Sequence, residues 1–310
     1  MTSTRYGLLW LRTIGMIVLG TVVISAGADG GQPDTLYHKE IEKWRNGRLA
    51  RLTSEDGWLT LAGLFWLKKG ENTLGSDPSN DIVLSQSKAP RSVGSLWLDK
   101  GDVRLEARPG AGVTHAGEPV STLVLRSDAD EEPTSVNLGT LSLHIIKRGE
   151  HLGLRVKDKE NPARLHFAGL EYYPVNPKWR IEARFEPYDP PKTLPIVNIL
   201  GMVENETSPG AFAFEVEGKP YRLDAVLEKG SEEFFIIFAD QTNGKETYGA
   251  GRFLYAAPPN AGGRVVVDFN KAYNPPCALT SYTTCPLPPP QNRLPFRVEA
   301  GEKAYAGSLH

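Results

Sequence analysis

Short apolar runs separated by turn-forming residues make up most of the chain after residue 70. Such runs, bounded by Gly, Pro, Asn and Asp, are typical of β-strands. The first series comprises Ile82–Leu84, Ser95–Leu98, Val103–Leu105, Thr122–Leu125, Leu141–Ile146 and Leu152–Val156. The second comprises Trp179–Phe185, Val197–Val203, Ala211–Val216, Tyr221–Leu227, Phe234–Ala239, Thr247–Tyr255 and Arg264–Asn270. The pattern predicts a mostly β protein of two packed β-sandwich or barrel-like units.

One helix precedes the strands. Tyr37, Ile41 and Trp44 lie at positions i, i+4 and i+7, which predicts a helix from Tyr37 to Leu52. The predicted organisation is a signal peptide (1–28), the helix with an apolar segment (29–70), a first β unit (71–158), a connector (159–178), and a second β unit that ends in a Pro-rich tail containing both cysteines (179–310).

The first 28 residues have the features of a secretory signal peptide. Arg5 and Arg12 precede an apolar run over Ile14–Ile24, and Ala26-Gly27-Ala28 offers a small-x-small cleavage site. We therefore expect an exported protein, periplasmic or extracellular. If the signal is not cleaved, it would serve as an N-terminal membrane anchor.

Charge and motifs exclude several functional classes. Thirty-five basic against 37 acidic residues give a net charge of −2, whereas binding to nucleic acid usually needs a basic excess. The chain has no nucleophile elbow, zinc-protease motif, Walker loop or dinucleotide-binding glycine motif. Its six histidines are scattered, so neither a metal site nor a cofactor is predicted; His144 is expected on the exposed face of a strand.

Cys277 and Cys285 are separated by seven residues in a Pro-rich segment. In an oxidising compartment, such a pair is most simply a disulfide. Two thiolate ligands of a metal site and two free thiols are the alternatives, although the spacing is not CxxC.

The first β unit resembles a forkhead-associated sandwich over Asn72–Leu84 and Val113–Val120. Ser76 stands where that family has its phosphate-binding Arg after Gly75, and Pro90–Gly94 replaces its Ser-Arg-x-His turn. The resemblance therefore implies the fold only, and no phosphothreonine peptide is expected as a partner.

A polar cluster is predicted near the C-terminus. Alternation places Val265 and Val267 on one face of their strand and Asp268 and Asn270 on the other. If residues 258–263 form the hairpin loop, Arg252 lies opposite Asp268. The tight turn at Asn243-Gly244 instead places Asp240 opposite Thr247, away from Arg252. The candidate ligand-binding residues are Tyr248, Arg252, Asp268, Asn270 and Tyr273.

The chain is also similar to domain-of-unknown-function family 1684, and the resemblance extends over nearly the whole mature chain. It is carried by Trp44-Arg45, Gly57–Leu59, Gly63–Leu67, Arg148-Gly149, Arg155–Asp158, Cys285–Pro289, Asn292–Leu294 and Ala300–Lys303. This resemblance implies no particular reaction.

Three functional hypotheses follow from the cluster. The first is an exported protein that binds a small polar or anionic ligand, because Arg252 could grip a carboxylate or phosphate. The second is an extracytoplasmic hydrolase in which Asp268 acts as acid or base. The third is a scaffold in which a buried Arg–Asp pair attaches the C-terminal tail to the sheet.

Overall fold

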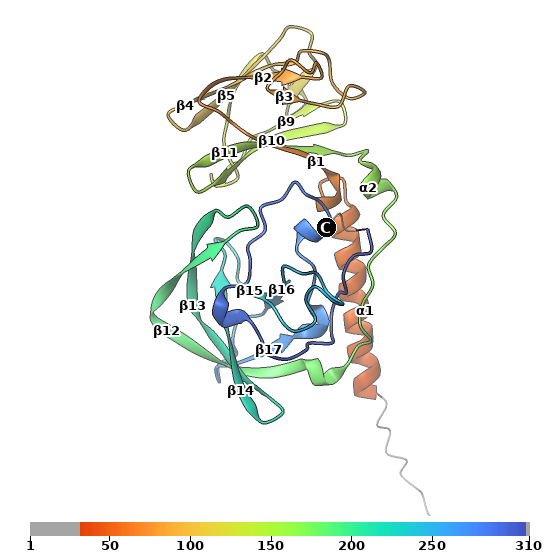
Figure 1. The fold of residues 1–310 in the computed structure, drawn as a ribbon, viewed down its shortest axis with the longest axis vertical. Helices are drawn as coiled ribbons and strands as arrows, with labels where there is room; N and C mark the ends of the chain where they lie inside the picture. The colour runs from red at the N-terminus through yellow and green to blue at the C-terminus, as the bar shows by residue number, and fades with distance from the viewer. Residues whose placement is uncertain (1–31, 308–310) are drawn as a thin grey trace, which may run out of the picture.

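The structure is a computed structural model that describes residues 32–307, so the predicted signal peptide lies outside the described part. The expected mostly β fold with one N-terminal helix is confirmed. Helix α1 (Gln32–Thr53) lies beside the lower unit in Figure 1, and its C-terminal end reaches the upper unit. No helix among the described residues is both long and apolar enough to cross a bilayer.

The upper unit contains two sheets. The first has the order β1-β11-β10-β9-β6-β7, with β1 (Leu61–Trp66), β6 (Val113–His115), β7 (Glu118–Pro119), β9 (Ser135–Leu138), β10 (Leu141–Arg148) and β11 (His151–Asp158). The second has the order β3-β2-β4-β5-β8, with β2 (Gly70–Gly75), β3 (Ile82–Val83), β4 (Gly94–Asp99), β5 (Asp102–Ala107) and β8 (Thr122–Leu125).

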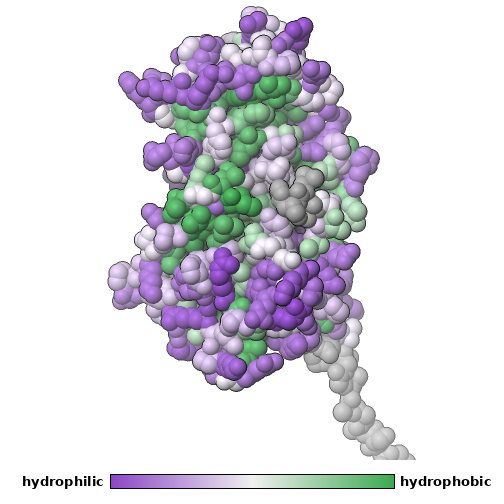
Figure 2. Space-filling model, in the orientation of Figure 1, coloured by the Kyte–Doolittle hydropathy of each residue, from purple (hydrophilic) through white to green (hydrophobic). Residues whose placement is uncertain are grey.

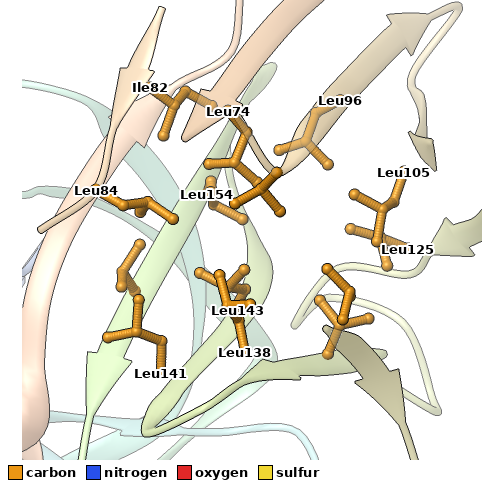
Figure 3. Close-up of a cluster of buried hydrophobic side chains, with 14 of the residues drawn as sticks. Leu74, Ile82, Leu84, Leu96, Leu105, Leu125, Leu138, Leu141, Leu143 and Leu154 are labelled. Carbon is orange, nitrogen blue, oxygen red and sulfur yellow. The ribbon is translucent and has the colours of Figure 1, made fainter. Parts of the chain in front are cut away.

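Apolar side chains from both sheets fill the space between them (Figure 3). On β10 and β11, every second residue points into this core, including Leu143 and Leu154, which are each 1% exposed. The intervening residues lie on the other face of the sheet. That outer face of β10 and β11 is directed towards the lower unit (Figure 1).

The lower unit is one strongly curved sheet with the order β16-β15-β14-β13-β12-β17. Its strands are β12 (Arg180–Val197), β13 (Val203–Val216), β14 (Lys219–Leu227), β15 (Phe234–Phe238), β16 (Arg252–Ala256) and β17 (Arg264–Asp268). The concave side holds a core that includes Phe212, Phe238 and Phe269, each fully buried. Short helix α2 (Pro162–Leu165) lies in the connector between the units.

The prediction of a strand over Val197–Val203 is wrong. β12 ends at Val197, β13 begins at Val203, and residues 198–202 form the turn between them. Asn198 makes this turn possible because its side chain accepts hydrogen bonds from the backbone N–H groups of Leu200 and Met202. The hairpin tip is apolar and partly exposed. On the face of the molecule in Figure 2, hydrophobic residues gather in the upper and middle parts.

Candidate functional site

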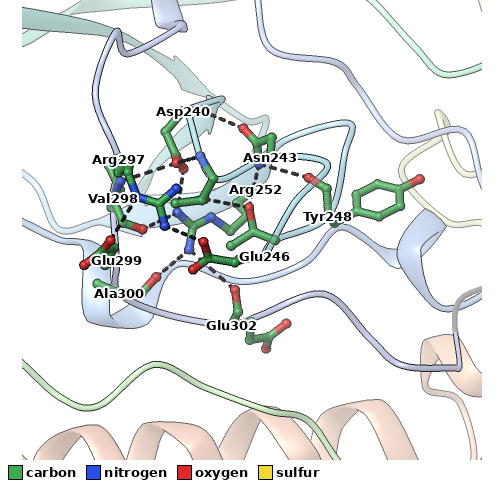
Figure 4. A network of polar contacts seen from close by, with 12 residues as sticks. Asp240, Asn243, Glu246, Tyr248, Arg252, Arg297, Val298, Glu299, Ala300 and Glu302 are labelled. Atoms are coloured by element: carbon green, nitrogen blue, oxygen red, sulfur yellow. Dashed lines mark hydrogen bonds and ion pairs between the residues drawn. The ribbon is translucent and has the colours of Figure 1, made fainter.

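Arg252 is the fully buried centre of a polar network (Figure 4). Its guanidinium forms an ion pair with Asp240 at 2.6 Å, and both side chains are 0% exposed. It also donates to the backbone carbonyls of Val298, at 2.9 Å, and of Ala300. These contacts bind both terminal nitrogens of the guanidinium, although its Nε has no acceptor among the described residues, and they attach the C-terminal tail to β16.

The predicted cross-strand pair of Arg252 and Asp268 is wrong. β16 and β17 do not pair as a hairpin, because they form opposite ends of the sheet order and β17 pairs with β12 instead. Arg252 lies over the ring of Phe238 in the concave core. Asp268 lies on the other side, where it accepts a hydrogen bond from the Tyr37 hydroxyl of α1 at 2.8 Å.

The expectation that Asp240 lies away from Arg252 is wrong as well. Asn243-Gly244 does not join the strands directly; the chain between β15 and β16 forms a wider loop, closed by a bond from the Gly244 N–H to the Thr247 carbonyl. The pairing of Phe238 with Arg252 then brings Asp240 next to Arg252. A two-residue turn would have required a different register.

Of the other predicted site residues, Asn270 and Tyr248 are buried away from the large cleft of the molecule, whereas Asp268 and Tyr273 line it. Asn270 is fully buried and donates to the Tyr37 hydroxyl and to the Asn176 carbonyl, so it connects α1 to the connector. Tyr248 is buried, and its hydroxyl lies 3.5 Å from the Cys277 carbonyl. Only Asp268 and Tyr273 of the five candidates line the large cleft of the molecule.

This cleft has a volume of about 1070 Å³ and lies between α1, the outer face of β10 and β11, the convex side of β15 and β16, and the C-terminal tail. Aromatic rings form one wall. Phe235 stacks on Tyr255 with 5.0 Å between ring centroids, and Tyr255 stacks on Tyr273 at 6.3 Å. Trp44 of α1 adds a fourth ring, 6.4 Å from Tyr273.

Arg155 of β11 lines the opposite end of the cleft and is 4% exposed. Among residues 32–307, its guanidinium has no hydrogen-bond acceptor and no carboxylate partner; it lies 5.6 Å from the ring centroid of Trp58. Burial, and secondly the charge of Arg148, lower the pKa of Arg155 to about 10. A buried cation without an acceptor is energetically unfavourable, so this residue needs an explanation.

Other basic groups surround Arg155 on the same face of the sheet. His144 pairs with Arg155 across β10 and β11, and it is partly buried, not freely exposed as expected. Burial and the charges of Lys157 and Arg155 lower the pKa of His144 to about 4. Burial also lowers the pKa of Lys157. Arg148, in contrast, pairs with Asp128 at 2.8 Å and donates to Thr284. Lys157 donates to the Asp56 carbonyl, so Arg155 differs from Lys157 and Arg148 in having no acceptor among the described residues.

Cys277 and Cys285 are adjacent buried thiols and are not joined in this structure. The disulfide therefore stays a prediction. The described residues contain no group of three or more His, Cys, Asp or Glu side chains placed to hold a metal ion.

Residues 165–303 match the family described as "Protein of unknown function (DUF1684)". The chain belongs to this family. The match to DUF1684 covers about half of the chain, not nearly all of the mature chain as expected from the scattered motifs. It includes the curved sheet, the rings of Phe235, Tyr255 and Tyr273, and most of the tail, whereas Trp44 and Arg155 lie outside it.

A solved structure similar to this DUF1684 chain is the solution NMR structure of an uncharacterized protein from Haloarcula marismortui. It is 30% identical, with coverage of 45% of this chain and 78% of that one and a TM-score of 0.39. No curated protein matches the chain.

Proposed function

We propose that this DUF1684 protein is exported and binds a small organic anion in the cleft. The observation that carries the proposal is Arg155: it is 4% exposed, lines the cleft, and has no acceptor in the described part of the chain. An anion bound there would supply the missing acceptor. Carboxylates and phosphates match a guanidinium well because each can accept two parallel hydrogen bonds.

The rest of the cleft indicates an apolar or aromatic body for this ligand. The stacked rings of Phe235, Tyr255 and Tyr273 form a wall on which a planar or aliphatic group can pack. The cleft volume of about 1070 Å³ is close to the upper end of the usual range for small-molecule sites, roughly 300–1,000 Å³. Such a ligand would place its anionic group at Arg155 and pack its apolar body against the aromatic rings.

Calorimetry with model compounds tests the proposal. Phenyl phosphate should bind to the wild-type protein more tightly than inorganic phosphate, because only the former also contacts the aromatic wall. Arg155→Met should abolish both binding signals. Arg104→Met is the matched control, since Arg104 is an exposed arginine of β5 paired with Glu106 and outside the cleft. Unchanged binding by Arg155→Met would refute the site.

Export has a separate experiment. The basic start, apolar run and Ala26-Gly27-Ala28 support cleavage after Ala28. The full chain should be expressed in a bacterium, fractionated, and its N-terminus sequenced. Protein recovered outside the cytoplasm without residues 1–28 supports export. Protein confined to the cytoplasm with an intact N-terminus contradicts it.

A hydrolase is the second candidate, supported by a smaller hollow of about 180 Å³ lined by Glu204, Glu206 and Glu228. Burial and the two neighbouring carboxylates raise the pKa of Glu206. A carboxyl group with a raised pKa can act as a general acid. If this chemistry operates, Glu206→Gln should abolish turnover of an anionic ester without changing its binding at Arg155.

A further inference from the structure

The two cysteines meet at one end of the cleft. Cys277 lies in a 3₁₀ turn (Pro276–Ala278), and its backbone N–H points at Sγ of Cys285 from 3.1 Å. Cys285 is held by a backbone bond from the Ile199 N–H to its carbonyl. Cys285 lines the cleft, whereas Cys277 is not among the lining residues. A reagent that enters the cleft therefore meets Cys285 first.

The surroundings of the two sulfur atoms differ. Sγ of Cys285 is near the Cys277 N–H, the Thr283 hydroxyl (3.6 Å) and the positive charge of Arg155. Burial opposes the thiolate, but the hydrogen bonds with Cys277 and Thr283 and the charge of Arg155 outweigh it and lower the pKa of Cys285. The hydrogen bond with Cys285, and then burial, raise the pKa of Cys277.

This asymmetry is the one that a reactive dithiol needs. The attacking group must be a thiolate, and thiolates form where hydrogen-bond donors and cations surround the sulfur. The second thiol must stay protonated until a mixed disulfide forms next to it. The geometry agrees with this order: Cys285 lines the cleft whereas Cys277 does not, and Arg155, a buried cation without an acceptor among the described residues, lines the same cleft.

We propose that Cys285 and Cys277 form a redox-active dithiol site, with Cys285 as the attacking thiolate and Cys277 as the resolving thiol, and that its oxidant is a low-molecular-weight disulfide. This proposal goes beyond ligand binding and does not depend on it. Arg155 acts as a positioning residue that stabilises the Cys285 thiolate.

The chemistry balances in two exchange steps. The Cys285 thiolate attacks one sulfur of the small disulfide; the S–S bond breaks, a mixed disulfide forms, and the first small thiolate leaves and takes up a proton. Cys277 then loses its proton and attacks Sγ of Cys285, which expels the second small thiolate. Two protein thiols are oxidised to one disulfide, and the small disulfide is reduced to two thiols.

Single-cysteine variants of the mature chain test the order of attack. Cys277→Ser retains only Cys285, and Cys285→Ser retains only Cys277. The neutral reagent iodoacetamide is added at pH 7 without denaturant. Cys277→Ser should then be alkylated at least about tenfold faster than Cys285→Ser. Adding Arg155→Met to Cys277→Ser should slow alkylation severalfold, and adding Arg104→Met instead should leave the rate unchanged.

Glutathione disulfide tests the second step. The wild-type protein should finish with an internal disulfide and no bound glutathione, Cys277→Ser should stop with one glutathione on Cys285, and Cys285→Ser should stay unmodified. If a variant fails to fold, limited alkylation of the wild-type protein followed by peptide mass spectrometry gives the same order. Preferential labelling of Cys277, or labelling only after denaturation, would overturn the proposal.

Discussion

Replacing Arg155 by methionine should make the unliganded protein more stable. In the folded protein, the Arg155 guanidinium is a buried charge without an acceptor in the described part of the chain. Burial lowers its pKa from the ordinary value of an arginine to about 10. Since one pKa unit corresponds to about 1.4 kcal/mol, the charge costs the folded state roughly 3 kcal/mol. An apolar side chain of similar length removes that cost.

Part of this gain is lost elsewhere. Methionine cannot reproduce the contact of the guanidinium with Trp58, worth about 0.5–1 kcal/mol, and its packing is not optimised. We therefore expect Arg155→Met to raise the free energy of unfolding by about 1–2 kcal/mol and Tm by about 3–6 °C. Because the folded pKa is the lower one, the cost is complete below pH 10 and shrinks as pH rises from there towards the higher pKa of the unfolded chain.

Urea unfolding and calorimetric melts of both proteins, without added anions, measure the effect. With phenyl phosphate at about 100 times its dissociation constant, the wild-type protein should gain about 2.7 kcal/mol and the variant nothing. A loss of more than about 1 kcal/mol in Arg155→Met without anion would show that Arg155 stabilises the fold, and the reasoning from its missing acceptor would fail.

Three further changes test other parts of the structure. Arg252→Met should cost about 3–5 kcal/mol in urea unfolding because it leaves Asp240 buried and unpaired; the exposed Arg264→Met is its control, and equal stability of the two would contradict a structural role. His144→Gln should flatten the pH dependence of stability, because the pKa of His144 is about 4 in the folded protein and 6.5 in the unfolded chain. As pH falls from 6.5 to 4, the wild-type protein should lose about 2–3 kcal/mol of unfolding free energy from this group, and the variant should not. Gly251→Ala should cost about 1–3 kcal/mol, because φ is +102° and a Cβ would lie 2.5 Å from Pro288, whereas Gly249→Ala meets nothing closer than 3.8 Å and should be nearly neutral; similar melting temperatures for these two would disprove the steric argument.

Local pattern was sufficient to predict the fold class. Alternation along Leu141–Ile146 and the repeated turn residues predict strands without knowledge of their partners, and the structure has β10 there. The prediction of a strand over Val197–Val203 was wrong because a hairpin tip made of Val, Ile and Leu has the same composition as a strand. The pairing of Asn198 with the turn N–H groups decides the outcome, and that pairing depends on conformation.

The candidate site depended on contacts that local pattern does not specify. The face of Arg252 could be predicted, but its partner required the position of β16 in the sheet order. From the sequence, Arg155 belongs to a strand and to a stretch similar to family 1684, but it was not expected in the site. The one signal for a site was a pair of basic residues at alternate positions, Arg155 and Lys157. That these residues line a cleft follows from the packing of α1 and the tail, which lie far away in sequence.

Residues 284–302 contact parts of the molecule that precede them in the chain, including α1. Glu302 forms an ion pair with Arg48 of α1, Thr284 accepts from Arg148 of the sandwich, and Val298 and Ala300 accept from Arg252. A nascent chain lacks these partners until residues 284–302 have been made, so α1 and the curved sheet cannot complete their packing before then. If the protein is exported unfolded, in line with the export proposed above, this late packing would keep the chain unfolded and competent for translocation.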